Sequence, residues 1–567
     1  MLQTTASQST VASENKPVLV LIPSSRFVDR ELQLEVGKIP PVLIPINGKV
    51  LLEFILERYP VDQTEVYLLT SEGTAAVMQH VKRLNRPNLH VIEVPTEEDL
   101  GSALVHGLKS LDLSRFQSMI INFGDTLVGV PESLAGSDAV VYDEIDESFR
   151  WTTFKRGDQG IRSISDRFQS DTVESACVFT GVFSFSKPEG LLKWLEQSSA
   201  EPAQGRFYSA LQGYLSEVPY ALVRAVEWDD FGHVDNYYQA KKRFVNKRFF
   251  NRVEIDQHRA VLTKKSSEVD KFTGEIRWYL ELPASLKCYI PQVFDYSLSR
   301  DKTYIRMEYY GYPTLSELFL FEGHTLGIWS HAIAAIFRVV EEMRSYQLHA
   351  PANEIKDALT EMYLEKSCSR LAALVEDPLL GEFILAPFTV NGVQFRALKE
   401  YIEMLPALLE HSVFGAPQAL SVIHGDLCLS NILFDPKTRI IKLIDPRGRF
   451  GSHTIYGDYR YELAKLCHSF NGRYEAIIND RFFAIKEPNS INFVVQTSAY
   501  QDQIAALFNR ILGRDYASEL NAVEVIEALL FLSMIPLHAD HPHRQIVMLA
   551  TGAQRIDKAV RRAGILK

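Results

Sequence analysis

In the second half of the chain, two short apolar segments lie close to three polar residues, Asp426, Asn431 and Asp445. The stretch reads SVIHGDLCLSNILFDPKTRIIKLIDPRG and spans residues 421–448. NILFD and IIKLID predict the two strands of a hairpin, with PKT as its turn. Asp426 and Asn431 lie in the loop before the hairpin, and Asp445 follows its second strand. This arrangement can bring all three side chains to one centre.

Phosphoryl transfer is a chemistry that such a centre can perform. It needs one carboxylate that orients the attacking hydroxyl and accepts its proton, and oxygen ligands for Mg²⁺ between the phosphates. Asp426, Asn431 and Asp445 supply these groups. The alternative is structural: Asp and Asn favour turns because they hydrogen-bond the local backbone. Asp426 and Asn431 would then be turn residues, and Asp445 would cap a loop.

The same segment resembles the aminoglycoside phosphotransferase and choline kinase group of the protein-kinase-like superfamily. Its loop reads HGDxxxxN in that group, and its metal-binding aspartate lies in an I-D-x-x motif. The resemblance implies that Asp426 is the catalytic base and that Asn431 and Asp445 bind Mg²⁺. It also implies ATP as the donor, a small hydroxylated molecule as the acceptor, and a bracing role for His424.

Residues upstream extend this resemblance. Lys264 ends the strand-like RAVLTK, and Glu275 lies in the helix-like segment that follows. In the resembling families a strand lysine holds the ATP phosphates and pairs with a helix glutamate. Lys265 stays open as the alternative, because strand alternation turns only one of the two lysines toward the nucleotide. Glu308 and Tyr310, in IRMEYY, are expected near the adenine.

One departure narrows the acceptor class. No GxGxxG loop precedes Lys264, where the chain reads KRFFNRVEID, and neither DFG nor APE is present. Aminoglycoside-type kinases often lack the glycine loop, so the departure weakens only the comparison with protein kinases. A small-molecule acceptor is therefore favoured over a protein.

The first half of the chain alternates short Val- and Ile-rich segments with helix-like ones, which predicts a doubly wound α/β sheet. Antiparallel strands are expected after Arg150, which makes the sheet mixed and Rossmann-like. The second half predicts a two-lobed, protein-kinase-like α+β domain, helical after residue 315 apart from the strands near 421–445. The predicted divisions are a disordered lead-in (1–16), a first domain (17–243), a small lobe (244–314) and a helical lobe (315–567).

Several segments of the first half, in order, resemble sugar-phosphate nucleotidyltransferases. They are PPVLIPINGKVLLEFILER (40–58), DLGSALVHGL (99–108), INFGDTLV (121–128), CVFTGVFSF (177–185) and EWDDFGHVDNYYQA (227–240). The resemblance implies that Asp125 and Asp230 share Mg²⁺ and that Gly101 and Ser102 lie beside the nucleotide base. Two carboxylates on one metal suit attack on the α-phosphorus of a nucleoside triphosphate. The alternative readings are a strand-end turn for Asp125 and a loop carboxylate for Asp230.

The phosphate-binding loop of that family, L-A-A-G-x-G-x-R, is absent. The chain has LIPSSRFVDREL at 21–32, with no glycine. Ser24, Ser25 and Arg26 can contact phosphate through hydroxyl and guanidinium groups. Residues with a β-carbon cannot copy the shape of a glycine loop, however. Pro41 also replaces the lysine of the family's K-P-L-L-P segment.

Composition excludes several classes of function. The net charge of −11 argues against a protein that binds nucleic-acid backbones. Five scattered cysteines without a CxxC pair predict neither disulfides nor zinc, as is usual in the cytoplasm. The sequence contains no run of about 18 uncharged apolar residues, so no membrane span is predicted.

His538, His541 and His543 do not have the spacing of a metal site on a helix, and a polar loop is expected there.

The sequence therefore predicts a bifunctional cytoplasmic enzyme. Its second half would phosphorylate a sugar, polyol or amino alcohol, and its first half would couple that phosphate to a nucleotide such as CTP. The product would be an activated precursor for surface polysaccharide, such as capsule. One alternative keeps the kinase and makes the first half a regulatory, degenerate domain. Another is a non-catalytic assembly protein.

Overall fold

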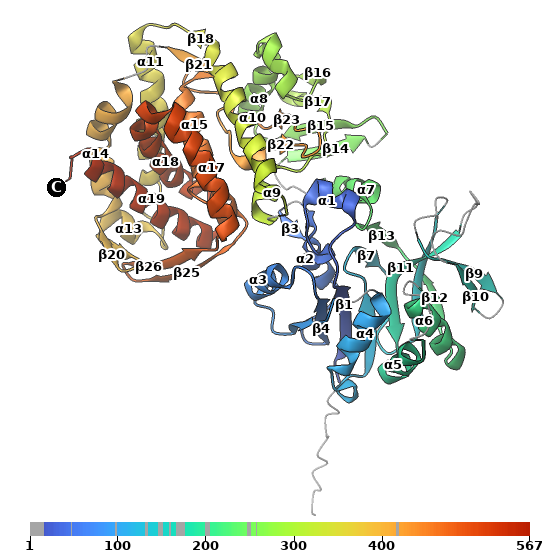
Figure 1. Ribbon diagram of the computed structural model, residues 1–567. Helices are drawn as coiled ribbons and strands as arrows, with labels where there is room; N and C mark the ends of the chain where they lie inside the picture. Colours follow the sequence, from blue (N-terminus) through green and yellow to red (C-terminus); the bar gives the residue numbers. More distant parts are fainter. Residues whose placement is uncertain are drawn as a thin grey trace, which may run out of the picture. The chain divides into compact units, whose positions relative to one another are not determined.

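The computed structural model describes residues 16–46, 48–96, 99–130, 134–145, 151–157, 160–165, 176–198, 205–245, 251–256, 258–321, 323–415 and 419–566. The predicted lead-in falls almost wholly outside these residues. The chain divides into two compact units (Figure 1). Unit 1 comprises Met1–Gln33 and Lys38–Ala240, and unit 2 comprises Leu34–Gly37 and Lys241–Lys567.

Unit 1 is built on a nine-stranded mixed sheet. Four of its strands are parallel and lie in the order β5-β4-β1-β6. Their bounds are Leu89–Glu93 (β5), Thr64–Thr70 (β4), Val18–Ser24 (β1) and Ser118–Asn122 (β6). The chain order reverses between β1 and β6, and in open α/β sheets ligands bind at the carboxyl ends of the strands on either side of such a point. Ser24 and Asp125 lie at or just beyond these two strand ends.

The rest of the sheet is mostly antiparallel. β11 (Ala176–Phe185) pairs antiparallel with β6 and with β8 (Ala139–Ile145), which carries β12 (Ala221–Arg224) parallel to it. β9 (Thr153–Gly157) and β10 (Gly160–Ser165) form a hairpin at its edge. A separate ribbon pairs β7 (Thr126–Gly129) with β13 (Glu227–Asp230), so that Asp230 lies opposite Thr126.

Helices of unit 1 bury their apolar stripes in the same core as the sheet. α4 (Leu100–Lys109), α5 (Pro188–Gln197) and α6 (Arg206–Glu217) contact one another. Their Leu104, Leu191 and Phe207 pack with Phe183 of the sheet in one buried cluster. Further helices that lie in or begin in this unit are α1 (Arg30–Val36), α2 (Leu51–Leu56), α3 (Thr74–Leu84) and α7 (Val234–Val245).

Unit 2 begins with a small lobe around a four-stranded antiparallel sheet in the order β14-β15-β17-β16. The strands are β14 (Asn251–Asp256), β15 (Val261–Ser266), β16 (Val293–Ser297) and β17 (Tyr304–Glu308). α8 (Val269–Glu281) follows β15 and buries Phe272, Ile276 and Tyr279, which recur at helical spacing. Lys264 on β15 and Glu275 on α8 therefore come from adjacent elements.

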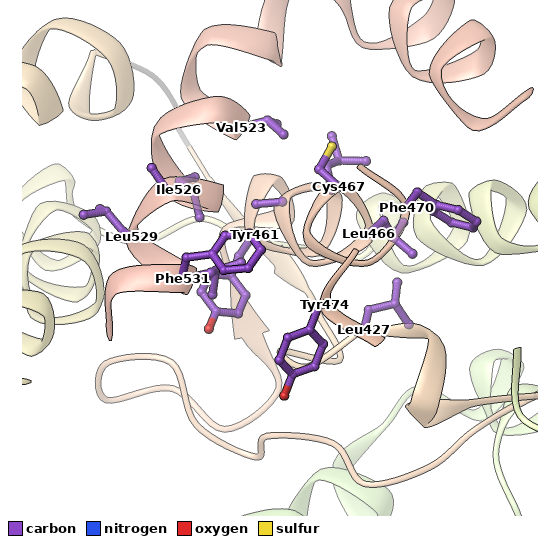
Figure 2. Packing of buried hydrophobic residues seen from close by; sticks show 14 of the residues in the cluster. Leu427, Tyr461, Leu466, Cys467, Phe470, Tyr474, Val523, Ile526, Leu529 and Phe531 are labelled. Atoms are coloured by element: carbon purple, nitrogen blue, oxygen red, sulfur yellow. The ribbon is translucent and has the colours of Figure 1, made fainter. Parts of the chain in front are cut away.

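The large lobe of unit 2 is mainly helical. Its longer helices are α10 (Leu326–Ser345), α14 (Leu398–Leu409), α15 (Tyr459–Phe470), α17 (Ala499–Asp515), α18 (Leu520–Met534) and α19 (Pro542–Arg562). Figure 2 shows Leu466 and Phe470 of α15 in the buried cluster that also holds Ile526 and Phe531 of α18. The segment Ala517–His538 has the length and apolar composition of a membrane span, but 67% of its most apolar window is buried in the protein. That burial is what a core helix shows.

The expectation of a helical second half is incomplete. A four-stranded sheet in the order β20-β19-β26-β25 also lies there. Its strands are β19 (Phe388–Val390), β20 (Val393–Phe395), β25 (Phe482–Glu487) and β26 (Ser490–Val495). β19 and β26 are about 100 residues apart in the chain, so their pairing leaves no local pattern. The predicted hairpin is present as β22 (Ile432–Phe434) and β23 (Ile441–Leu443), with Ile432 opposite Leu443.

Candidate functional site

The β22–β23 hairpin fixes the loop of residues 424–431, the predicted catalytic loop, next to Asp445. The Ile444 backbone N–H donates to the Asn431 carbonyl at 3.0 Å, directly after the paired strands. The Asn431 side-chain NH₂ donates to the carbonyl and to Oδ2 of Asp426, at 2.9 and 3.0 Å. Asp426, Asn431 and the segment that ends at Asp445 are thus joined by hydrogen bonds.

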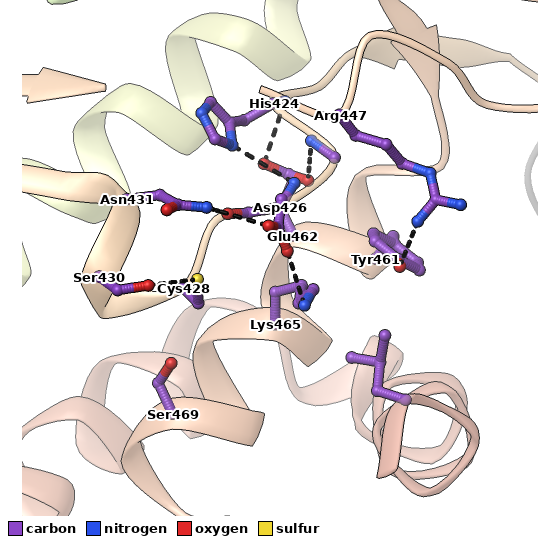
Figure 3. Close-up of polar contacts among 12 residues, drawn as sticks. His424, Asp426, Cys428, Ser430, Asn431, Arg447, Tyr461, Glu462, Lys465 and Ser469 are labelled. Carbon is purple, nitrogen blue, oxygen red and sulfur yellow. Dashed lines mark hydrogen bonds and ion pairs between the residues drawn. The ribbon is translucent and has the colours of Figure 1, made fainter. Parts of the chain in front are cut away.

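Asp426 is held by a lysine from another element. Nζ of Lys465, on α15, lies 2.6 Å from Asp426 Oδ1, as Figure 3 shows. Burial alone would raise the pKa of Asp426, but the Lys465 ammonium outweighs it and holds this pKa below its ordinary value. The Asp426 side chain is nevertheless 40% exposed. It is therefore an ionised carboxylate that a substrate can reach.

His424 braces this loop as a neutral ring. Its Nε2–H donates to the Ile444 carbonyl at 3.0 Å, and its Nδ1 accepts from the Asp426 N–H at 3.3 Å. Burial lowers the pKa of His424 to about 4, which keeps the ring neutral and able to make both bonds. Glu462 on α15 accepts the backbone N–H groups of His424 and Gly425, at 3.1 and 2.8 Å. These bonds fix the backbone that carries Asp426.

Lys264 connects the two lobes of unit 2 through one ammonium group. Its Nζ lies 2.7 Å from Glu275 Oε1 and 2.8 Å from Asp445 Oδ1. Burial lowers the pKa of Lys264, but Asp445 and Glu275 outweigh it and the net direction is upward. Lys265 points the other way: its side chain is 47% exposed and lies 3.8 Å from Glu254. Of the two candidate lysines, Lys264 is the one turned toward Asp445.

Asp445 has backbone and side-chain features that suit a metal ligand. Its φ is +55°, in the left-handed region that only some non-glycine residues tolerate. Its N–H donates to the Tyr279 hydroxyl at 3.2 Å, which fixes the strained turn to α8. Its carboxylate is 46% exposed. Asn431 uses its NH₂ group on Asp426, which leaves its carbonyl oxygen for a cation. An oxygen donor set of this kind fits Mg²⁺.

Glu308 and Tyr310 lie where the small lobe passes into the large one. Glu308 ends β17, and its N–H donates to the Gln292 carbonyl at 2.9 Å. The Tyr310 hydroxyl donates to Glu308 Oε2 at 2.7 Å. Lys442 Nζ stands 4.9 Å from the Tyr310 ring centroid. The two side chains predicted near the adenine are therefore hydrogen-bonded to each other. Lys442, on the β22–β23 hairpin, lies over the Tyr310 ring.

In unit 1 the structure brings Asp125 and Asp230 together. A Cβ on Gly232 would lie 2.9 Å from Asp125 Oδ2 and 3.3 Å from Asp230 Oδ1, so only glycine leaves room between them. Asp230 Oδ2 accepts from His233 Nδ1–H and Asn236 Nδ2, both at 2.7 Å. Burial and the nearby Asp230 carboxylate raise the pKa of Asp125 to about 7. Two crowded carboxylates at a sheet edge fit a divalent cation.

The two serines and the arginine at the end of β1 and just after it differ in exposure. The Ser24 side chain is buried, and its Oγ accepts the Val42 N–H at 3.4 Å. Ser25 is half-buried and Arg26 is exposed. The Ser24 hydroxyl therefore already serves the fold, and Ser25 and Arg26 are more exposed than Ser24.

Gly101 and Ser102 lie in the first turn of α4. Asp99 caps this helix by accepting the Ser102 N–H at 2.9 Å and its hydroxyl at 2.8 Å. Arg206 also donates to the Ser102 hydroxyl. A cavity of about 520 Å³ opens beside Ser102, and it is lined further by Val105, His106, Lys109, Ser110 and Arg206. Ser102 thus borders a cavity, but its polar groups are already bonded within the protein.

Comparison with known families identifies the second unit. Residues 244–489 match the model of the phosphotransferase enzyme family. This range contains Lys264, Asp426, Asn431 and Asp445, which the structure brings together. The segment is a phosphotransferase domain. With this domain the protein is an ATP-dependent phosphotransferase.

Other comparisons concern the N-terminal part. HddC from Yersinia pseudotuberculosis is 19% identical, covers 40% of this chain and 99% of its own, and has a TM-score of 0.31. The structure of HddC complexed with GMP-PN is 18% identical, covers 40% of this chain and 99% of its own, and has a TM-score of 0.31. A putative glucose-1-phosphate thymidylyltransferase from Bacillus anthracis, in complex with a sucrose, is 11% identical. It covers 41% of this chain and 97% of its own, and has a TM-score of 0.32. Likenesses at this level carry no inference about activity. No curated protein matches the chain.

The sequence did not single out two residues of the phosphotransferase domain that its geometry brings to the fore. Lys465 and Glu462 lie on α15, and both side chains are buried next to the catalytic loop. Charged residues in a helix usually face water, so YRYELAKLCHSF gives no sign that this lysine and glutamate point inward. Their roles follow only from the contact of α15 with residues 424–426.

The phosphotransferase domain can perform an in-line phosphoryl transfer with few protein groups. In the predicted roles, Asp426 would orient an acceptor hydroxyl and take its proton, and Lys264 would hold phosphate oxygens. Asn431 and Asp445 would hold Mg²⁺, which supplies charge neutralisation between the phosphates. Glu275 keeps Lys264 oriented, and Lys465 keeps Asp426 ionised.

Proposed function

We propose that the protein is a bifunctional enzyme that makes a nucleotide-activated small molecule. Unit 2 transfers the γ-phosphoryl group of ATP to a hydroxyl of a sugar, polyol or amino alcohol. Unit 1 then joins the phosphorylated product to a nucleotide from CTP or another nucleoside triphosphate and releases pyrophosphate. The convergence of Lys264, Asp445, Asn431 and Asp426 is the observation that carries the kinase half.

The carboxylate pair of unit 1 supports the second activity. Asp125 and Asp230 face each other across Gly232, near the carboxyl end of β6 where the strand order reverses. Nucleotidyl transfer to a phosphate needs a metal at such a pair. The two chemistries are complementary, because a phosphate monoester is both the product of one and the substrate of the other. We propose that these two successive reactions take place in the cytoplasm and supply precursors for a surface polysaccharide such as capsule.

An assay of both half-reactions tests this proposal. The full chain is incubated with ATP, Mg²⁺ and a panel of sugars, polyols and amino alcohols, and ADP release is measured. CTP or UTP is then added, and pyrophosphate release is measured. We expect ADP release that depends on one acceptor class, followed by pyrophosphate release that depends on the first product. Pyrophosphate release that stays at background with a broad panel of phosphates would remove the transferase half.

A second candidate keeps the kinase and makes unit 1 a regulatory domain without catalysis. The motivating observation is that residues 21–32, which run from the end of β1 into the following loop, contain no glycine, and that the Ser24 hydroxyl is used within the fold. A loop of this composition cannot wrap a triphosphate with backbone N–H groups alone.

Replacing Asp125 by Ala separates the two candidates. If unit 1 is catalytic, Asp125→Ala should lower pyrophosphate release by about 10²-fold or more, because one metal-binding carboxylate is lost. ADP release with acceptor should stay at the wild-type rate. Asp112→Ala, at an exposed position in the same unit, is the control and should change neither rate. A regulatory unit 1 would show no pyrophosphate release in any of the three proteins.

A further inference from the structure

A group of basic side chains surrounds the Tyr461 ring in the phosphotransferase domain. Lys366 Nζ lies 5.5 Å from the ring centroid, and Arg447 Cζ lies 5.9 Å from it. Arg447 also donates to the Tyr461 hydroxyl at 3.2 Å (Figure 3). Lys366, Arg447 and Arg370, which stands near both, are called the basic cluster below.

Helix geometry places the basic cluster beside the catalytic base. Tyr461 and Lys465 are four residues apart on α15 and so lie on one face of this helix. Lys465 holds Asp426 at 2.6 Å. The Tyr461 ring thus lies one turn from the lysine that touches the base. Lys366 interacts electrostatically with Asp426 as well.

In the part of the chain that the structure describes, the basic cluster makes no ion pair with a carboxylate. Among the described residues, no Asp or Glu lies within ion-pair distance of Lys366, Arg370 or Arg447. The neighbouring Arg449 differs, because its guanidinium lies 3.1 Å from Glu361. Asp426, a carboxylate that interacts electrostatically with Lys366 and Arg447, is already paired with Lys465. Cations that are crowded without counter-ions cost free energy, which a bound anion would recover.

Burial and mutual repulsion are visible in the cluster itself. All three side chains are half-buried, so a ligand can reach them. Burial, and then the cations Arg447, Arg370 and Lys465, hold the pKa of Lys366 well below its ordinary value. Arg370 is anchored by a 2.9 Å hydrogen bond to the Ser533 carbonyl, so it cannot swing away into water without losing this bond. A π-helix, η7 (Thr360–Glu365), directly precedes Lys366, and such helices are frequent at functional sites.

We propose that the acceptor of the phosphotransferase domain is itself an anion, a hydroxylated molecule with a phosphate monoester or carboxylate group that Lys366, Arg370 and Arg447 bind while its hydroxyl meets Asp426. This inference rests on the proposed kinase function and adds the acceptor's charge to it. Arginine and lysine together suit such a group, because guanidinium binds it in a fork and ammonium adds a point charge. An amino alcohol without an acidic group would be repelled at this position.

Chemical labelling of the wild-type protein tests the inference without turnover. The full chain, saturated with a non-hydrolysable ATP analogue and Mg²⁺, is treated with acetic anhydride, and acetylation of single lysines is read by mass spectrometry. Glycerol, choline, glycerol 3-phosphate and glycerate serve as probes. We expect glycerol 3-phosphate, glycerate or both to lower acetylation of Lys366 at least several-fold, and glycerol and choline to leave it unchanged. The two anions distinguish a phosphate from a carboxylate acceptor.

Variants show whether the basic cluster carries the effect. Lys366→Met keeps the length of the aliphatic stem, and Arg370→Met removes the second cation. The double variant should bind the protecting anion about 10-fold more weakly or worse, the loss expected for charge-assisted hydrogen bonds. Lys356→Met is the matched control, since Lys356 lies on the preceding helix, is 57% exposed and pairs with Glu410. It should bind the anion as the wild type does.

The outcomes separate the inference from the proposed function. Equal acetylation of Lys366 with anions and with glycerol, or protection by choline, overturns the inference even if ADP release proves the kinase. If an anion lowers acetylation of Lys366 but no acceptor causes ADP release, the anion site is supported and the proposed kinase function is wrong. If the double variant does not fold, the wild-type labelling still decides between these results.

Discussion

Replacing Asp426 by Asn is expected to lower the kcat of phosphoryl transfer by about 10²- to 10⁴-fold, the range of a lost general base. Asn keeps the size and the hydrogen-bonding shape of the side chain, and one of its groups can still face Asn431. It cannot accept the acceptor's proton. The KM for ATP should change little, because Asp426 contacts Asn431 and Lys465 and is expected to act on the hydroxyl.

Asp480→Asn is the control for this experiment. Asp480 lies in the same unit, is 56% exposed and pairs with Arg544. It should retain the wild-type kcat. An Asp426→Asn protein that transfers phosphate at the wild-type rate would show that another group takes the proton.

The second large effect is expected at Lys465, which acts through Asp426. Lys465→Met removes the ammonium that holds the Asp426 pKa down, and burial then raises this pKa. A base with a higher pKa is protonated over a wider pH range. The acidic limb of the kcat profile should therefore move to higher pH in the variant, and kcat at pH 6 should fall more than kcat at pH 8. A loss of about 10-fold or more is expected at the lower pH.

Two further measurements separate this positioning role from a loss of folding. Lys465→Arg keeps the positive charge and should leave the acidic limb near its wild-type position. A melting temperature shows how much stability each variant loses. An equal fall in kcat at every pH in Lys465→Met would assign to Lys465 a purely structural role.

Much of the kinase-like site was readable from the sequence because its parts are local. Asp426, Asn431 and Asp445 lie within one loop and one hairpin, so chain connectivity alone keeps them close. Strand alternation left Lys264 and Lys265 as alternatives, and the structure turns Lys264 toward Asp445 and Lys265 outward. Their functional roles remain predictions for the variants above.

The features that the sequence did not reveal depend on distant contacts. Lys465 faces Asp426 only because α15 packs against the predicted catalytic loop. The basic cluster combines two residues of α12 (Lys366–Ala372) with Arg447 from the loop after β23. The β20-β19-β26-β25 sheet was missed for the same reason, since β19 pairs with β26 across many helices. In unit 1 the alternation predicted the parallel strands, whereas the crowding of Asp125 and Asp230 at Gly232 required the folded ribbon of β7 and β13.

Lys264 holds Glu275 with the same ammonium that holds Asp445. The negative charge of Asp445, a predicted Mg²⁺ ligand, is therefore balanced within the chain itself. The contacts of Lys264 with Glu275 and Asp445 can therefore form during folding in the absence of nucleotide. If Asp445 holds Mg²⁺ as predicted, Lys264 would exchange this carboxylate for phosphate oxygens when nucleotide binds, while Glu275 would keep its contact with the lysine. The Asp445 carboxylate would thus be an internal substitute for the phosphate group that Lys264 is predicted to hold.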